Sequence, residues 1–275
     1  MTIQQNLEAI KQEIKKNILI WLCYPVEIIF WAIFPLLWVI PFLFQGIALV
    51  GGLMSQSFKG LTGTGQYIPF VLIGAVVSSY VFSSLYGMGG SLRVESYWGT
   101  LELILGSPTN RLTILLGKAL SESIMATFFA ISQAAVCVVL FGLKLTLGKI
   151  MPTLLVMVLT VTGLYGLGIA LAGITLQIKE SRSLAHTLEN VFMLCSPVRY
   201  PVEISPILKI ISWAIPLTYA LVVIRGLMLL NRSVIELWEN VVILAGIDLF
   251  FIAFGVFVFY GMERKVRRSG VVSEY

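Results

Sequence analysis

The sequence predicts an all-α integral membrane protein with six transmembrane helices, and three observations support this fold class. Of the 275 residues, 58% are hydrophobic and only 12% are charged, whereas a soluble domain carries roughly 25% charged residues. Several runs reach the roughly 20 apolar residues that a helix needs to cross a bilayer. These runs lack the alternation of a membrane barrel strand, and open sheets do not span lipid, so the spans are helices.

The first twenty residues have the pattern of a helix that lies on the membrane surface. Glutamates and lysines separate apolar residues that recur every three or four positions, namely Ile3, Leu7, Ile10, Ile14 and Ile18. This spacing puts the apolar side chains on one helical face. We expect that face to enter the acyl boundary while the lysines approach anionic headgroups.

Six apolar segments follow, which we assign as spans. They cover residues of about 25–49, 67–90, 115–143, 151–178, 183–198 and 241–260. The fourth segment is rich in glycine and alanine, small residues that let neighbouring helices approach closely. We expect a single membrane domain over residues 1–275.

Residues 201–230 are apolar enough to suggest a seventh span, but the distribution of charge argues against one. With six spans both termini lie on one side of the membrane, and a seventh would move the basic C-terminal tail away from the other basic residues, against the positive-inside rule. We therefore expect two short helices, hinged near Pro216, that dip in from the outer face. The inner side then collects twelve of the nineteen basic residues: Lys11, Lys15, Lys16, Arg93, Arg111, Lys118, Lys179, Arg182, Arg264, Lys265, Arg267 and Arg268.

A polar stretch from Arg93 to Lys118 follows the second span. On a helical wheel its apolar residues share one face, while Glu95 and Glu102 project from one flank and Leu103 lies alone on the polar side. Proline and the residue before it disfavour helix continuation, so this helix ends before Pro108. We expect a short amphipathic helix on the inner surface, which either docks a soluble partner or only rests on headgroups.

Two parts of the chain resemble a known family. Residues 95–118 read ESYWGTLELILGSPTNRLTILLGK, and they resemble the loop between the second and third spans of the type-2 permeases of ATP-binding-cassette (ABC) transporters. That loop often reads E-x-x-x-G-T-L-E-x-L-L-x-S-P. Residues 201–220 read PVEISPILKIISWAIPLTYA and are followed by Arg225, which is similar to the outer re-entrant segment of these permeases. Order, spacing and span number agree over essentially the whole chain.

The resemblance implies a dimeric export permease driven by a separate ATPase. Residues 1–20 would be its elbow helix and residues 93–107 its coupling helix, seated in a cleft of a cytosolic ATP-binding subunit. The loop after the fourth span would be a second contact. Glu95, Gly99, Thr100, Leu101 and Glu102 are assigned to the first contact by matching position. The full set of residues expected at the two contacts is Arg93, Glu95, Trp98, Gly99, Thr100, Leu101, Glu102, Leu103, Lys179, Glu180 and Arg182.

The implied partners are two copies of the ATP-binding subunit, membrane lipids, and either a second copy of this chain or a paralogous permease. The implied location is the plasma (inner) membrane of a prokaryote, with both termini in the cytosol. The net charge of +5 reports membrane topology, so we expect no nucleic-acid partner.

The chain lacks the loop that binds nucleotide phosphates, G-x-x-x-x-G-K-[ST]. The glycine-rich residues 60–66, GLTGTGQ, lack the Lys-Ser/Thr pair that contacts phosphates and Mg²⁺. We therefore expect a non-catalytic permease, with ATP and Mg²⁺ bound by the partner subunit. No cofactor is expected in this chain, and no His, Cys and Asp cluster has the spacing of metal ligands.

Ionisable and aromatic residues inside spans are candidates for a substrate path, because charge is costly there. The candidates are Glu27, Trp31, Trp38, Tyr80 and Asp248. Asp248, the only aspartate, is closest to the bilayer midplane and either lines the path or hydrogen-bonds to a neighbouring helix. Short outer loops and apolar spans favour a hydrophobic or amphipathic cargo such as a drug, an antibiotic, a lipid or a lipid-linked glycan.

Two other functional classes make different demands on the sequence. A secondary transporter or channel would require inverted repeats or broken midplane helices with several ionisable residues. This chain has one midplane acid and no evident repeat. An intramembrane enzyme would want a carboxylate cluster or paired histidines, and His186 is the only histidine. The export permease is the leading interpretation, and a transporter or channel not driven by ATP is the alternative.

Overall fold

The computed structural model describes residues 3–50, 56–141, 147–177 and 181–269. Within these ranges the regular structure is helical and contains no β-strand, which confirms the predicted all-α class. The elements are α1 (Ile3–Leu22), α2 (Pro25–Val50), α3 (Gln56–Thr62), α4 (Tyr67–Phe82), the π-helix η1 (Ser83–Met88), α5 (Ser91–Tyr97), α6 (Leu101–Gly106), α7 (Arg111–Phe141), η2 (Leu147–Lys149), α8 (Ile150–Thr175), α9 (Ser181–Cys195), η3 (Val202–Ile204), α10 (Pro206–Ser212), α11 (Pro216–Met228), η4 (Ile235–Leu237) and α12 (Trp238–Ser269).

Four helices within the described ranges are long and apolar enough to cross a membrane, as expected of an integral membrane protein. They cover Tyr67–Tyr97, Arg111–Ala135, Ile150–Thr175 and Ile235–Val266. Two further pairs are apolar enough but bent, by 87° between Gln4–Leu22 and Pro25–Ile33 and by 95° between Pro206–Ser212 and Pro216–Met228. By length and composition, the described residues therefore hold four candidate spans, or up to six when each bent pair counts as one.

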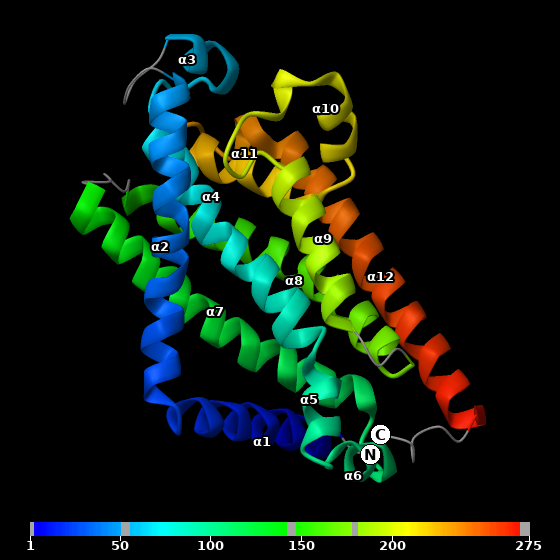
Figure 1. Cartoon of the computed structure of the whole chain (residues 1–275). Helices are drawn as coiled ribbons and strands as arrows, with labels where there is room; N and C mark the ends of the chain where they lie inside the picture. Colours follow the sequence, from blue (N-terminus) through cyan, green and yellow to red (C-terminus); the bar gives the residue numbers. More distant parts are fainter. Residues whose placement is uncertain (1–2, 51–55, 142–146, 178–180, 270–275) are drawn as a thin grey trace.

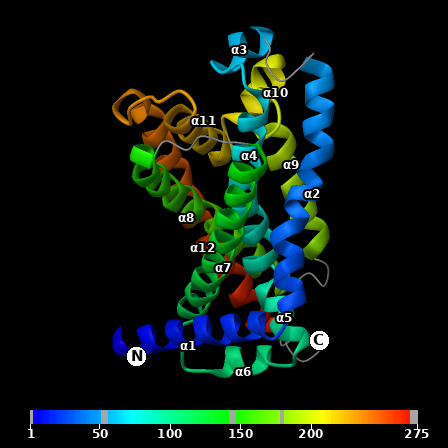
Figure 2. The ribbon, with the colours of Figure 1, turned by 90° about the vertical axis from the view of Figure 1, so that its left-hand side faces the viewer.

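Both bends lie where the sequence predicts a change of direction. α1 meets α2 at nearly a right angle, and Figure 2 shows α1 lying across one end of the bundle while α2 runs along it. This geometry suits α1 to a membrane surface. α10 and α11 are two short helices and α11 begins at Pro216, so the predicted hinge is confirmed. Proline suits the first turn of a helix, where its missing N–H would have no intrahelical partner.

The helices place the two ends of the described chain at one end of the bundle. Figure 1 shows α1, α6 and the C-terminal part of α12 at this end, which we call the α1 end, and α3 and α10 at the opposite end. Both arms of the α10–α11 pair stay near the opposite end, and α12 runs back from there to the α1 end. The arrangement fits a segment that dips into the membrane and returns.

α9 covers most of the fifth predicted span, residues 183–198, but it is short for a membrane crossing. Its 15 residues rise about 22 Å at 1.5 Å per residue. The hydrocarbon core of a bilayer is about 30 Å thick, so the residues that flank α9 must complete any crossing.

The packing of α8 against α12 depends on glycine. A Cβ atom added at Gly255 of α12 would collide with the carbonyl oxygen of Gly166, and one added at Gly173 would meet the backbone of Phe259. The small residues of the fourth predicted span therefore do let a neighbouring helix approach closely, as expected. η1 packs against α8, and α11 packs against both α8 and α12.

Candidate functional site

The polar stretch that follows the second span is two short helices rather than one. α5 ends at Tyr97 and α6 begins at Leu101. Gly99 has a φ of +68°, a left-handed conformation that glycine adopts without strain. The N–H of Thr100 donates to the Glu95 carbonyl and the N–H of Gly99 donates to the Ser96 carbonyl, which is the Schellman pattern of helix termination. The prediction of one continuous helix over residues 93–107 is therefore wrong.

This break separates the two glutamates that the helical wheel placed on one flank. Glu95 is 2% exposed, whereas Glu102 is exposed to solvent. Leu101 is also buried, at 7%. Of the residues expected to contact a partner, Glu95 and Leu101 thus point into the protein in this conformation.

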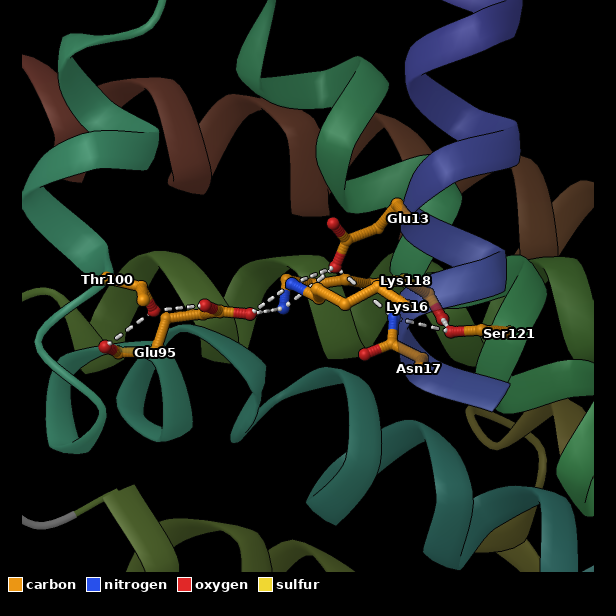
Figure 3. Close-up of polar contacts among 7 residues, drawn as sticks. All are labelled: Glu13, Lys16, Asn17, Glu95, Thr100, Lys118 and Ser121. Carbon is orange, nitrogen blue, oxygen red and sulfur yellow. Dashed lines mark hydrogen bonds and ion pairs between the residues drawn. The ribbon is translucent and has the colours of Figure 1, made fainter. Parts of the chain in front are cut away.

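The Glu95 carboxylate lies in a cluster of four charged side chains from three helices. Its Oε1 atom lies 2.6 Å from Lys118 Nζ of α7 and 2.8 Å from Lys16 Nζ of α1. Glu13 of α1 completes the set, 3.3 Å from Lys118 and 2.9 Å from Lys16. Figure 3 shows Lys16 and Lys118 lying between the two carboxylates. We call these four residues the charge cluster.

Neutral donors extend the charge cluster. The Thr100 hydroxyl donates to Glu95 Oε2, so the turn that ends α5 is tied to the same carboxylate. One helical turn along α7 from Lys118, Ser121 accepts a hydrogen bond of 3.0 Å from the Asn17 side chain of α1. The charge cluster and these hydrogen bonds therefore connect the elbow-like helix α1, the α5–α6 turn and α7.

The electrostatics of the charge cluster are balanced, because two lysines face two glutamates. Burial by itself would lower the pKa of Lys16, but its contacts with Glu95 and Glu13 outweigh burial and the pKa lies above its ordinary value. Lys16 is therefore charged at neutral pH. Removing one partner from a buried ion pair typically costs about 3–5 kcal/mol, because the other charge is left uncompensated. The charge cluster thus resists any separation of α5 from α1 and α7.

Large side chains on α5 and α6 face away from the bundle. Trp98 is 54% exposed, Leu103 is 74% exposed and Tyr97 is 72% exposed, with Glu102 beside them. The Arg93 guanidinium donates to the Tyr97 hydroxyl at 2.8 Å. Exposed aromatic and apolar groups of this kind are typical anchors of protein–protein interfaces. We call Tyr97, Trp98, Glu102 and Leu103 the α5–α6 surface.

The second expected contact is only partly described. Lys179 and Glu180 lie outside the described residues. Arg182 is exposed near the start of α9. Its role in partner binding stays a prediction.

The candidates for a substrate path do not form one group. Glu27 is exposed and accepts a hydrogen bond of 3.4 Å from Trp31 Nε1 on the same helix. Tyr80 is buried and donates to Thr127 of α7 at 3.1 Å. The side chain of Trp38 lies outside the described residues.

Asp248 of α12 is buried against α8. It is 1% exposed, and a Cβ atom added at Gly163 would collide with its carboxylate. Among the described residues, no hydrogen-bond donor reaches either carboxylate oxygen. The expected hydrogen bond to a neighbouring helix is therefore absent from the described part of the structure, and the residue does not line an open path in this conformation.

Sequence reasoning missed Lys16 and Lys118 as partners of Glu95, and it missed Glu13 as a second partner of the same two lysines. Lys118 falls within the third predicted span, and a charge at that depth requires a partner. The rule that a buried charge needs a partner was the signal in the sequence that Lys118 pairs with an acid. It did not say which acid is the partner, because Lys16 lies 79 residues and Lys118 lies 23 residues from Glu95 in the chain.

A buried arginine in the re-entrant segment was also missed as a structural link. Arg225 is 6% exposed and donates to the carbonyls of Pro197, Phe70 and Val198, at 2.8 Å for Phe70 and 3.0 Å for Val198. Its guanidinium carbon also lies 3.4 Å from the centre of the Phe70 ring. Arg225 thus joins α11 to α4 at the end of the bundle opposite α1.

Comparisons with known proteins point to one family. A sequence model described as ABC-2 type transporter matches residues 26–229, from the start of α2 to the end of α11. This range contains both α5–α6 and the α10–α11 pair. No curated protein matches the chain.

Proposed function

The chain belongs to the ABC-2 type transporter family and is a membrane-spanning permease component of an ABC transporter, and from this premise we propose how it works. It forms the translocation pathway of an ATP-driven exporter, as a dimer with a second copy or a paralogous permease. A separate ATP-binding subunit docks on each permease from the cytosol. The chain itself carries no G-x-x-x-x-G-K-[ST] loop, and the partner binds ATP and Mg²⁺.

The α5–α6 surface is the observation that carries this proposal. It presents two aromatic rings and Leu103 to solvent at the α1 end of the bundle. An apolar surface of this kind at the end of a membrane bundle supports a protein partner, because water-exposed apolar patches mark interaction sites. In the proposed topology the α1 end faces the cytosol of a prokaryotic cell.

The charge cluster supports a path by which movement of the ATP-binding subunits reaches the membrane helices. When the two ATP-binding subunits close, the α5–α6 surface moves with them. Because Glu95 is held to Lys118 at 2.6 Å and to Lys16 at 2.8 Å, that movement passes to α7 and α1 rather than bending a loop. Nucleotide drives the change by binding one arrangement of the transporter better than the other.

The transported cargo is a hydrophobic or amphipathic molecule. The described spans expose many apolar side chains to their surroundings, and four of them meet the length and hydropathy of a membrane crossing. A drug, an antibiotic, a lipid or a lipid-linked glycan fits this class.

The test is co-purification of a co-expressed ABC ATP-binding subunit with permease variants. Leu103→Ala and Trp98→Ala remove anchors of the α5–α6 surface, and truncating an anchor typically costs at least about 2 kcal/mol, or roughly 30-fold in affinity. Ile207→Ala is the matched control, since Ile207 is 70% exposed on α10 at the opposite end. Equal recovery of the ATP-binding subunit with all three variants would contradict the proposal.

A further inference from the structure

The side chain of Arg225 joins three segments at the end of the bundle opposite α1. From α11 it donates to the Phe70 carbonyl near the start of α4, and to the carbonyls of Pro197 and Val198 in the turn that follows α9. Its guanidinium also lies over the Phe70 ring. That ring in turn meets the Phe58 ring of α3 nearly edge to face, with 5.2 Å between the ring centres. We call the contacts of Arg225 with Phe70, Pro197 and Val198 the outer contact.

Gly74 of α4 lets the outer contact close tightly. A Cβ atom added at Gly74 would collide with the Val198 carbonyl oxygen and would lie 2.9 Å from a terminal nitrogen of Arg225. The space between α4 and the turn after α9 therefore has no room for even a methyl group. In this conformation α4, α11 and that turn are closed against one another.

The outer contact contains no ion pair. Among the described residues, no carboxylate oxygen lies within 4 Å of Arg225, and Glu203, an exposed residue of η3, acts on it electrostatically from farther away. Lys118 at the α1 end, by contrast, lies within ion-pair distance of two carboxylates. A buried charge without a close counter-ion keeps much of the cost of losing its hydration. The outer contact is therefore easier to break than the charge cluster.

Unpaired polar atoms beside the outer contact also favour its opening. Arg225 Nε, the Ser196 hydroxyl and the Thr218 hydroxyl are buried, and none has a hydrogen-bond partner among the described residues. A buried polar group without a partner is destabilising, and water removes that cost when the group becomes exposed. Hydrogen bonds and close packing thus hold this end closed, while three unpaired atoms would gain from contact with water.

We propose that Arg225 is a latch that holds the outer end of the permease closed and is released when cargo leaves. In the released arrangement α11 and the turn after α9 move apart from α4, and water hydrates the guanidinium. Such a contact, formed in one arrangement and broken in the other, gives two discrete states rather than a gradual deformation. That release accompanies transport rests on the proposed export function, whereas closure by Arg225 requires no ATP-binding subunit.

The first test measures how fast a cysteine at position 196 reacts with a charged, water-soluble maleimide. Ser196 is 0% exposed and directly precedes Pro197, so Ser196→Cys reacts only when the outer end opens. The full-length permease is purified into lipid nanodiscs without an ATPase, with Cys23, Cys137 and Cys195 replaced by serine. Arg225→Met deprives the Pro197 and Val198 carbonyls of their donor. We expect it to raise the reaction rate about tenfold, because the rate follows the population of the open form.

Two variants separate release of the latch from general loosening of the fold. Ser84→Cys places the thiol at another 0% exposed position, in η1, and we expect Arg225→Met to leave its reaction rate unchanged. Arg225→Lys keeps the charge, but an ammonium group does not reproduce the planar fork of donors, so we expect a rise of about threefold at position 196. An unchanged rate at position 196 in Arg225→Met, or equal rises at positions 196 and 84, would overturn the proposal.

The second test asks whether the latch opens during the transport cycle. The cysteine at position 196 is labelled in the complex with the ATP-binding subunit, with and without ATP and vanadate, which trap the ATP-binding subunits closed. We expect trapping to raise the rate about tenfold, as nucleotide shifts the population toward the released arrangement. An unchanged rate in a complex that hydrolyses ATP would overturn release of the latch and leave the proposed function intact. Failure to recover the ATP-binding subunit would contradict the proposed function, and the first test would still decide whether Arg225 holds the outer end closed.

Discussion

Replacing Lys118 by methionine tests whether the charge cluster holds the α5–α6 turn in place. Lys118 is 5% exposed, and its ammonium group lies 2.6 Å from Glu95 and 3.3 Å from Glu13. The variant leaves both carboxylates facing Lys16 alone. Because Lys16 still offsets one of these charges, we expect a loss near the lower end of the range for a broken buried pair, about 3 kcal/mol in the free energy of unfolding.

A second substitution distinguishes loss of charge balance from loss of packing. In Lys118→Met with Glu95→Gln, the remaining Lys16 and Glu13 balance each other at 2.9 Å. We expect the double variant to lose less stability than the two single variants lose together, by about 0.5–3 kcal/mol, since residues in one ion-pair network couple to that extent.

The assay is unfolding of the purified permease by titration with sodium dodecyl sulfate, followed by tryptophan fluorescence. Lys11→Met is the control, because Lys11 and its partner Glu8 are both solvent-exposed and 3.9 Å apart. A Lys118→Met curve that overlays the Lys11→Met curve would refute the idea of a buried charge cluster. Additive effects of Lys118→Met and Glu95→Gln would refute the coupling.

Three other predictions follow from the fold. Gly255→Val places a side chain against the Gly166 carbonyl, and we expect little monodisperse protein on gel filtration; normal yield would contradict the α8–α12 packing. Gly99→Ala forces alanine into a left-handed conformation at a cost of about 1–2 kcal/mol and should reduce co-purification of the ATP-binding subunit, whereas Gly106→Ala, where a Cβ atom has open space, should not. Cysteines introduced at Glu8 and Asn231 should react with impermeant label from opposite faces of sealed vesicles, and reaction from one face would rule out the six-span topology.

The spans and the re-entrant hinge could be predicted because they depend on local properties of the chain. A run of about 20 apolar residues has few alternatives to crossing a bilayer as a helix. The hinge at Pro216 follows from the charge distribution, which forbids a crossing, and from proline, which suits a helix start. The length of α9 was less predictable, since its apolar run continues beyond the 15 residues that are helical.

The interior of the site could not be predicted, because it depends on contacts between distant residues. A helical wheel assumes a continuous helix, and Gly99 ends that helix after two turns. The pair Gly99-Thr100 was a signal of helix termination in the sequence. No local pattern shows that Glu95 turns toward Lys16 and Lys118, or that Asp248 lies against Gly163 with no donor among the described residues.

Photo-crosslinking from position 103 tests most directly the claim that α5 and α6 dock an ATP-binding subunit. A photoreactive phenylalanine analogue replaces Leu103, which is 74% exposed, and the same analogue replaces Ile207 at the opposite end as the control. The account predicts that position 103 crosslinks to the ATP-binding subunit and that position 207 does not. Crosslinks from position 103 to lipid alone, or equal yields from both positions, would contradict it.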